Sequence, residues 1–447
     1  MACRATRACS FVFAALLLST STTIAAERSI AVEARLGQTV MKAGETQRNY
    51  IRIAVNGCER EKVDRPPVNI ALVIDRSGSM QGLRIAQAQE AAISALKRLD
   101  KNDIASVVIF DDRIDVLVPA QQVVDHNMYI DRIRQVSARG STAIHAGVMQ
   151  GAEEVRKFKD KNRLNRILLL SDGLANVGPS KPDDFDRLGA ELLTEGISVS
   201  TIGLGLQYNE DLMAKLARAS DGNHAFVSEP ADLIQIFNRE FDDVLASCAQ
   251  TVSIDVDMRP GVKLVRSLSR DGSVTGQHAN FRMNQVYQAT EHYVLLEVEL
   301  DKSVAASDGP QDLGTVRVAY TQDGTERRLE AGISGRFSAS DQEVKAGRDG
   351  TVLESVVEQT TRERAKTAIE LRDKGKINEA QALFKQNAAE INAYTAAAPA
   401  TSARIQSLQK EYDAIATQPA ASPSQWNAQR KSLKQIDTAP AGAKSRF

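Results

Sequence analysis

The chain has 447 residues, of which 43% are apolar and 25% charged, and its 56 Lys and Arg nearly balance its 57 Asp and Glu. This composition indicates a globular protein of about three domains, and its near-neutral charge argues against a general nucleic-acid binder, which carries a basic excess. No apolar run reaches the roughly 20 residues that a membrane-spanning helix needs, so we expect no transmembrane segment in the mature chain.

The first 26 residues differ from the rest and predict a secretory signal peptide. Arg4 and Arg7 supply positive charge, an apolar block follows at Phe11–Leu18, and the small residues Ala25 and Ala26 end the segment. This order is typical of a signal that is cleaved near Ala26. We therefore expect a periplasmic or secreted mature protein, with an uncleaved membrane anchor as the alternative.

Residues 66–246 alternate apolar, strand-like runs with amphipathic helices, which predicts a doubly wound, Rossmann-like α/β domain. The run at Val68–Ile74 is almost continuously apolar, as expected for a parallel strand that is covered on both faces. The expected strands are Val68–Ile74, Ile104–Phe110, Ile114–Val118, Arg166–Leu170, Ile197–Gly203 and His224–Val227. The expected helices are Leu83–Leu99, Met128–Val136, Ala143–Phe158, Pro182–Leu193, Asn209–Ala219 and Ala231–Ala246.

The flanking segments follow a different pattern. Residues 27–65 and 247–340 favour period-two alternation, as in Val252–Val256, and we interpret them as two halves of one β-sandwich that holds the inserted α/β domain. Residues 350–417 are predicted to be helical. Residues 418–447 carry prolines and little apolar content, so a flexible tail is expected there.

Two cysteines, Cys58 and Cys248, remain after removal of the predicted signal, and they lie at the two junctions of the inserted domain. An oxidising compartment permits them to form a disulfide, which would link the two chain segments that enter and leave the inserted domain. Two buried thiols are the alternative.

Three segments rich in side-chain oxygens fall at predicted carboxyl ends of strands or at a helix start. Asp75–Ser79 follows the first strand, Gly140–Thr142 opens a helix, and Ser171–Gly173 follows a later strand. Because open α/β sheets bind ligands at this edge, we expect five side chains to converge: Asp75, Ser77, Ser79, Thr142 and Asp172. Hard oxygen ligands without His or Cys suit Mg²⁺, with Ca²⁺ or Mn²⁺ as alternatives.

The Asp-x-Ser-x-Ser loop, the distant Thr and the later Asp-Gly resemble the metal-ion-dependent adhesion site of von Willebrand factor type A domains, over roughly residues 66–246. The stretches 65–69 and 170–178 look like exported bacterial proteins of this family, and the layout is loosely similar to that of inter-alpha-trypsin inhibitor heavy chains. The resemblance implies that the five residues hold the ion, some through water. The last ligand position would await an acidic side chain of a partner protein.

These features predict a non-enzymatic, metal-dependent protein-binding module of the cell envelope. Specificity is expected in residues at the rim of the site, namely Arg76, Met80, Asp111, Asp112 and Asn176. A structural, metal-stabilised envelope module is one alternative. A metal-dependent hydrolase has less support, because His145 is the only histidine near these segments in sequence and motifs such as His-Glu-x-x-His are missing.

Overall fold

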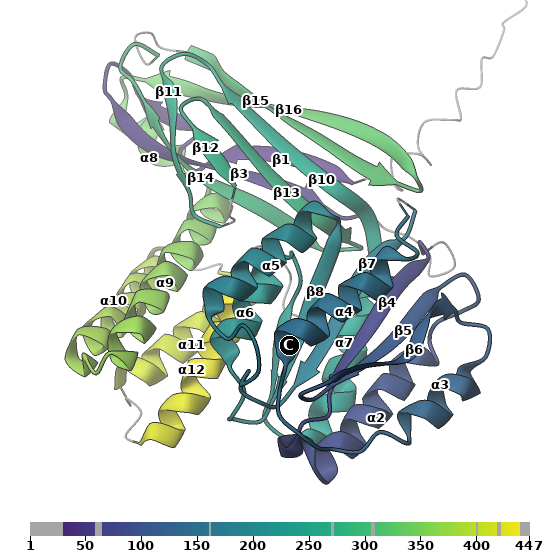
Figure 1. The fold of residues 1–447 in the computed structure, drawn as a ribbon. Coiled ribbons are helices and arrows are strands. Elements are labelled where there is room, and N and C mark those ends of the chain that lie inside the picture. The colour runs from purple at the N-terminus through teal and green to yellow at the C-terminus, as the bar shows by residue number, and fades with distance from the viewer. Residues whose placement is uncertain are drawn as a thin grey trace, which may run out of the picture.

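The computed structural model describes residues 30–58, 65–160, 162–269, 272–304, 309–398, 401–417 and 422–438. The predicted signal peptide at residues 1–26 lies outside these ranges. Within them, no helix combines the length and the apolar character that crossing a membrane requires. Figure 1 shows a β-sandwich, an α/β domain below it and a group of C-terminal helices beside both.

The α/β domain is built on a six-stranded sheet of order β6-β5-β4-β7-β8-β9. Neighbouring strands are parallel except at one edge, where β6 runs antiparallel to β5. The strands are β4 (Val68–Asp75), β5 (Ile104–Phe110), β6 (Ile114–Gln122), β7 (Leu164–Ser171), β8 (Ile197–Leu204) and β9 (His224–Val227). Every residue of β4, β5, β7 and β8 is buried, which explains their continuous apolar runs.

Helices cover both faces of this sheet and form a separate apolar core with each face. One face packs against α2 (Leu83–Leu96), α3 (His126–Ile133) and α7 (Leu233–Leu245). The other face packs against α4 (Ile144–Arg156), α5 (Pro182–Thr194) and α6 (Glu210–Ala219). Two short 3₁₀ turns, η2 (Gly78–Met80) and η3 (Pro230–Asp232), precede α2 and α7. The predicted doubly wound fold is confirmed.

The sandwich takes strands from both sides of the α/β domain. Its two sheets have the orders β1-β3-β14-β11 and β12-β13-β10-β15-β16-β2, and they enclose one apolar core. The strands before the insertion are β1 (Ala31–Leu36), β2 (Val40–Lys42) and β3 (Gln47–Asn56). Those after it are β10 (Ser247–Met258), β11 (Val262–Ser267), β12 (Ser273–Thr275), β13 (His278–Tyr287), β14 (Glu291–Leu300), β15 (Gly309–Gln322) and β16 (Thr325–Ser338). Because β3 pairs with β14 along its whole length, the inserted arrangement is also confirmed.

A buried arginine joins the α/β domain to the sandwich. Arg166 on β7 is fully buried, and its guanidinium donates to the hydroxyl of Ser200 at 2.8 Å within its own sheet. It also donates to Gln285 Oε1 and to the Tyr287 hydroxyl on β13, each at 2.8 Å. These contacts fix one strand of the sandwich against the amino-terminal half of the parallel sheet.

The two junction cysteines meet in the sandwich core. Both are buried, and the backbone N–H of Cys58 donates to Sγ of Cys248 at 3.1 Å. No disulfide bond joins them in the structure. The fold therefore places the two cysteines next to each other, while the disulfide bond between them stays a prediction.

The C-terminal region is helical beyond the range that the sequence predicts. It consists of α8 (Asp341–Ala346), α9 (Gly350–Asp373), α10 (Ile377–Ala397), α11 (Ala403–Thr417) and α12 (Pro423–Thr438). The expectation of a flexible tail at 418–447 is wrong for α12, which packs against α6, β9 and α9. Its polar sequence gives little sign of this, because ion pairs with the α/β domain hold it together with the burial of Leu433.

Candidate metal site and its pocket

The candidate metal site lies where β4 and β7 end side by side. The strands are parallel, with Ile74 opposite Leu170, so that Asp75 and Asp172 leave the sheet at the same edge. Both carboxylates are fully buried. The strand arrangement thus brings together the two acidic residues that the sequence predicts as ligands.

Asp75 is held by hydrogen bonds to both carboxylate oxygens. The backbone N–H of Ser77 donates to Oδ1 at 2.7 Å, and the hydroxyl of Ser171 donates to Oδ2 at 2.5 Å. Burial raises the pKa of Asp75 to about 6, and the nearby charge of Asp172 acts in the same direction against these hydrogen bonds. Without a bound cation, the buried site therefore disfavours the ionised form of Asp75, and a cation close by would favour it.

The three predicted hydroxyl ligands lie next to the second carboxylate. Ser77 Oγ lies 3.1 Å from Ser79 Oγ, which donates to Asp172 Oδ1 at 2.6 Å. The position of Thr142 follows from Gly173, where an added Cβ would lie 2.9 Å from Thr142 Oγ1 and 3.5 Å from Ser79 Oγ. A glycine at 173 therefore leaves room for the hydroxyls to approach one another.

Hydrogen bonds between the loops fix this arrangement. The N–H of Gly78 donates to the carbonyl of Gly140 at 3.0 Å, and Gly140 has a φ of +70°, a conformation that favours glycine. The side-chain oxygen of Asn176 accepts from the N–H of Thr142 at 2.7 Å, and the N–H of Asn176 donates to the Thr142 carbonyl at 3.1 Å. The segments are thus braced before any ligand binds.

The chemistry of these residues fits a hard divalent ion. Across the residues that the structure describes, no three or more His, Cys, Asp or Glu side chains gather into a metal-binding cluster. The candidate set has a different make-up, with two carboxylates and three hydroxyls. Such oxygens suit Mg²⁺, Ca²⁺ or Mn²⁺, and hydrogen bonds place three of the five side chains, those of Ser77, Ser79 and Asp172, in direct contact.

Arg84 is a residue of the site that the sequence analysis missed. Its Nη1 donates to Asp172 Oδ2 at 2.6 Å and to the backbone carbonyl of Ser79 at 3.1 Å. The guanidinium thus neutralises one of the two carboxylates. No motif marks Arg84, because only the direction in which α2 leaves the loop brings its side chain back over the site.

Three of the five expected rim residues are buried instead. Met80 is fully buried in the apolar core beneath α2. Arg76 and Asp111, 8% and 0% exposed, form an ion pair with Nε and Oδ2 2.9 Å apart. The expectation that these three contact a partner is wrong, since they brace the loops from within. Asp112 and Asn176 are exposed and stay candidates.

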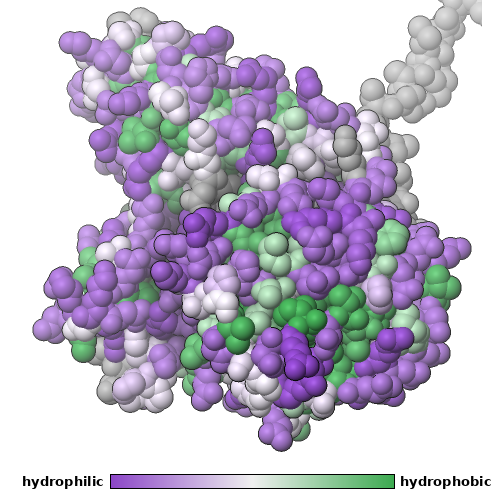
Figure 2. Space-filling model, in the orientation of Figure 1, coloured by the Kyte–Doolittle hydropathy of each residue, from purple (hydrophilic) through white to green (hydrophobic). Residues whose placement is uncertain are grey.

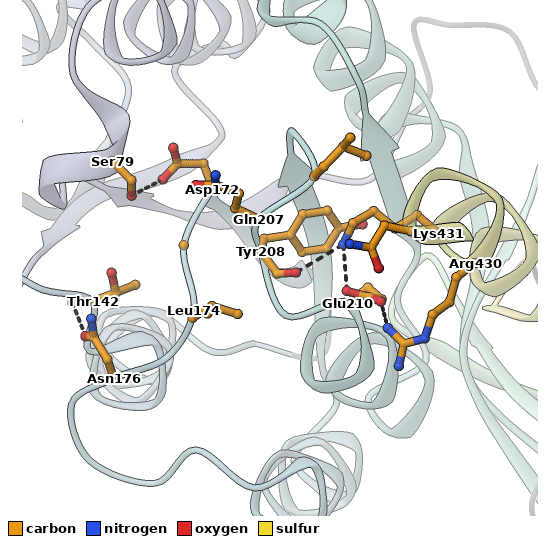
Figure 3. A pocket seen from close by; sticks show the side chains of 13 residues that line it. Ser79, Thr142, Asp172, Leu174, Asn176, Gln207, Tyr208, Glu210, Arg430 and Lys431 are labelled. Atoms are coloured by element: carbon orange, nitrogen blue, oxygen red, sulfur yellow. Dashed lines mark hydrogen bonds and ion pairs between the residues drawn. The ribbon is translucent and has the colours of Figure 1, made fainter. Parts of the chain in front are cut away.

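A pocket of about 570 Å³ opens beside the candidate ligands (Figure 3). Ser79, Thr142 and Asp172 lie at one end of it, and residues of α12 line the other end. The exposed side chains of Leu174 and Leu206 also line it. The candidate ligands are therefore reached through a bounded pocket rather than a flat surface.

His145 does not take part in this pocket. Its ring packs edge-on against Phe185 with the ring centroids 5.6 Å apart, and burial lowers its pKa. Among the described residues that line the pocket, none is a histidine. This geometry favours a packing role for His145 over that of a general base.

Comparison with known proteins agrees with the fold. Residues 69–239 match the family described as von Willebrand factor type A domain. This segment is a VWA domain. The chain is 28% identical over 285 residues to an uncharacterized protein of Synechocystis sp., an alignment that covers 62% of this chain and 66% of that protein.

Other relatives match over shorter ranges. Human inter-alpha-trypsin inhibitor heavy chain H2 is 29% identical over 173 residues, which cover 36% of this chain and 18% of the heavy chain. The chain thus spans about two thirds of the Synechocystis protein and a much smaller part of the heavy chain. Among solved structures, the von Willebrand factor type A protein from Catenulispora acidiphila has the same fold, with a TM-score of 0.75 at 14% identity over 96% of this chain and 99% of that one.

Proposed function

We propose that the protein is a divalent-metal-dependent protein-binding module, in which Asp75, Ser77, Ser79, Thr142 and Asp172 hold Mg²⁺, or alternatively Ca²⁺ or Mn²⁺. The observation that carries this proposal is the convergence of two buried carboxylates and three hydroxyls at the end of a pocket. When bound, the ion would supply an electrophilic centre with a position open to a carboxylate oxygen of a partner.

The chain's own residues suit binding better than catalysis. Ser77, Ser79 and Thr142 contribute neutral oxygens. The ion would therefore face only two carboxylates, one of which is already paired with Arg84, and would stay attractive to a third. A hydrolase needs a base beside the ion, and the packing of His145 against Phe185 does not supply one. We therefore propose a non-enzymatic role.

The cellular location is part of the proposal. The N-terminal pattern of Arg4, Arg7 and the apolar block Phe11–Leu18 supports export to the periplasm or beyond the cell. A module of the cell envelope would there meet other exported proteins, and one that presents an exposed acidic side chain is the proposed partner.

Capture of a partner with and without metal tests this function. The mature chain is immobilised and exposed to envelope extract of its source cells in Mg²⁺ or in chelator, beside Thr142→Val, which removes one proposed ligand oxygen and keeps the shape. Ser141→Ala is the matched control. A partner should bind to the wild type and to Ser141→Ala in Mg²⁺ only. Equal capture in chelator would contradict the proposal.

The structural alternative predicts a different outcome. If the ion only stabilises the fold, chelator should lower the melting temperature of the protein and of Ser141→Ala alike, while no protein is retained in a metal-dependent way. The two functions are therefore separated by comparing metal-dependent stability with metal-dependent capture on the same samples.

A further inference from the structure

The pocket that begins at the candidate metal site ends at α12, a helix from the far end of the chain. Asn427, Arg430 and Lys431 of this helix contribute to its lining. Figure 3 shows Arg430 and Lys431 across the pocket from Ser79 and Asp172, with Tyr208 and Glu210 beside them. One wall of the pocket therefore comes from outside the VWA domain.

Ion pairs fasten α12 to the first turn of α6. Lys431 Nζ lies 2.6 Å from the buried carboxylate of Glu210, which Arg430 also contacts. Arg430 Nη2 lies 2.6 Å from Asp211 Oδ2. Lys431 is only 2% exposed and lies 3.9 Å above the ring of Tyr208, whose backbone carbonyl it also contacts at 3.1 Å. Buried contacts of this kind give the wall a defined position.

A second set of contacts holds α12 to α9. The indole Nε1 of Trp426 donates to Asp373 Oδ1 at 3.1 Å, and Arg430 Nε donates to Asp373 Oδ2 at 2.8 Å. The guanidinium of Arg372 lies 4.2 Å from the centre of the Trp426 ring. The helix is thus fixed from both sides, and the pocket between it and the candidate ligands stays open.

The lining of the pocket indicates what it can hold. Leu174 and Leu206 both line the pocket and are 58% and 43% exposed, so they offer apolar surface to whatever enters it. Figure 2 shows that apolar side chains on the visible face also gather over the α/β domain. Arg84 and Lys431, the cations at its two ends, are already paired with Asp172 and Glu210. The proposed ion is therefore the group that would take an acidic side chain, and the leucines complement an apolar neighbour.

We propose that α12 and the two leucines form a specificity wall, so that the pocket accepts an extended segment of a partner protein in which an acidic side chain adjoins an apolar one. The inference rests on the proposed function, because the acidic side chain is the one that completes the ion's ligands. The apolar neighbour would lie against Leu174 and Leu206, and the segment would run along Asn427.

A displayed peptide library tests the wall directly. Random heptapeptides are selected on the immobilised mature chain in Mg²⁺, with chelator elution, and a selected peptide is then titrated by fluorescence polarisation. Asn427→Trp fills the pocket from the exposed side of α12, and Ser424→Trp places the same bulk on α12 outside the pocket. We expect selected peptides to pair Asp or Glu with an apolar residue, and Asn427→Trp to weaken their binding at least about tenfold while Ser424→Trp leaves it within about twofold.

A second variant examines the leucines. Leu174→Ser combined with Leu206→Ser should retain metal-dependent binding of acidic peptides and lose the preference for an apolar neighbour. If Asn427→Trp binds the peptides as well as the wild type does, or if the selected peptides lack the apolar residue, the proposed specificity wall is contradicted.

Calorimetric metal binding is measured on every variant. If the wild type binds no metal ion, the proposed function is overturned. If the wild type binds metal but no peptide is selected, only the proposed specificity wall is overturned.

Discussion

Arg84 pairs with the carboxylate that the proposed ion requires. Its Nη1 lies 2.6 Å from Asp172 Oδ2, with the carboxylate fully buried and the guanidinium 32% exposed. The other oxygen of Asp172 accepts from Ser79. An arriving divalent ion would therefore meet a site in which one carboxylate already has a cation, and Arg84 would have to release it or share it.

Removing this cation should strengthen metal binding. Arg84→Ala deletes a charge-assisted hydrogen bond to Asp172 and a positive charge beside the ion, so we predict about tenfold tighter Mg²⁺ or Mn²⁺ binding by calorimetric titration. Arg187→Ala removes an arginine that is 74% exposed on α5, and it serves as the control for net charge. Unchanged or weaker binding in Arg84→Ala would show that the arginine does not compete with the metal.

Acid should destabilise the VWA domain through His224. This side chain is buried and hydrogen-bonded to Thr201 and Tyr208, and burial, with the charge of Lys431, lowers its pKa from 6.5 to about 3. Between those pH values the unfolded chain binds a proton that the folded chain does not. The free energy of unfolding should therefore fall as pH falls, by about 2 kcal/mol from pH 7 to pH 5 on account of this residue.

Urea unfolding at several pH values isolates this effect. His224→Asn keeps a polar side chain that does not titrate in this range, so its stability should depend less on pH than that of the wild type, whatever its absolute value. The difference between the two pH profiles is the quantity to compare, since all other groups contribute to both. Parallel profiles would mean that His224 is protonated to the same extent in both states.

Arg166 should stabilise the contact between the α/β domain and the sandwich. Arg166→Met removes the donors to Ser200, Gln285 and Tyr287 in a fully buried setting, which we predict to cost about 3 kcal/mol. The control is Arg328→Met, a change at an arginine whose side chain is 81% exposed. Calorimetry should show a clear fall in melting temperature for Arg166→Met only, and equal shifts in both variants would exclude this role.

The cysteine pair should oxidise readily once the protein is exposed to an oxidising buffer. The backbone N–H of Cys58 donates to Sγ of Cys248, so the fold already places the two residues side by side. We predict that mature protein folded with a glutathione redox pair loses both thiols, as counted by mass spectrometry after alkylation, while Cys248→Ser leaves one. Persistence of two alkylated thiols in the wild type would favour the alternative of buried thiols.

Much of the site follows from sequence because parallel strands impose it. A short apolar run such as Val68–Ile74 is typical of an inner parallel strand, and the residues after such strands share one edge of the sheet. That rule alone brings Asp75 and Asp172 together. The same reasoning predicts the sandwich from alternating patterns on either side of the insertion, since those strands need partners that the α/β domain does not provide.

The remaining features depend on contacts that spacing does not encode. Met80 lies in the same loop as Ser79, and only the η2 turn decides that one points inward while the other is exposed. Likewise α12 is predicted as a tail because its attraction to the VWA domain comes from Lys431 meeting Glu210, a partner 221 residues away. Ion pairs between distant segments leave no periodic pattern.

The central claim is that the five oxygen-bearing residues hold a divalent ion. The most direct measurement is a calorimetric titration of Mg²⁺ and Mn²⁺ into the chelator-stripped mature protein, beside Asp75→Ala. Saturable binding of one ion to the wild type and none to Asp75→Ala is the predicted result. Equal binding to both proteins, or none to the wild type, would contradict the account.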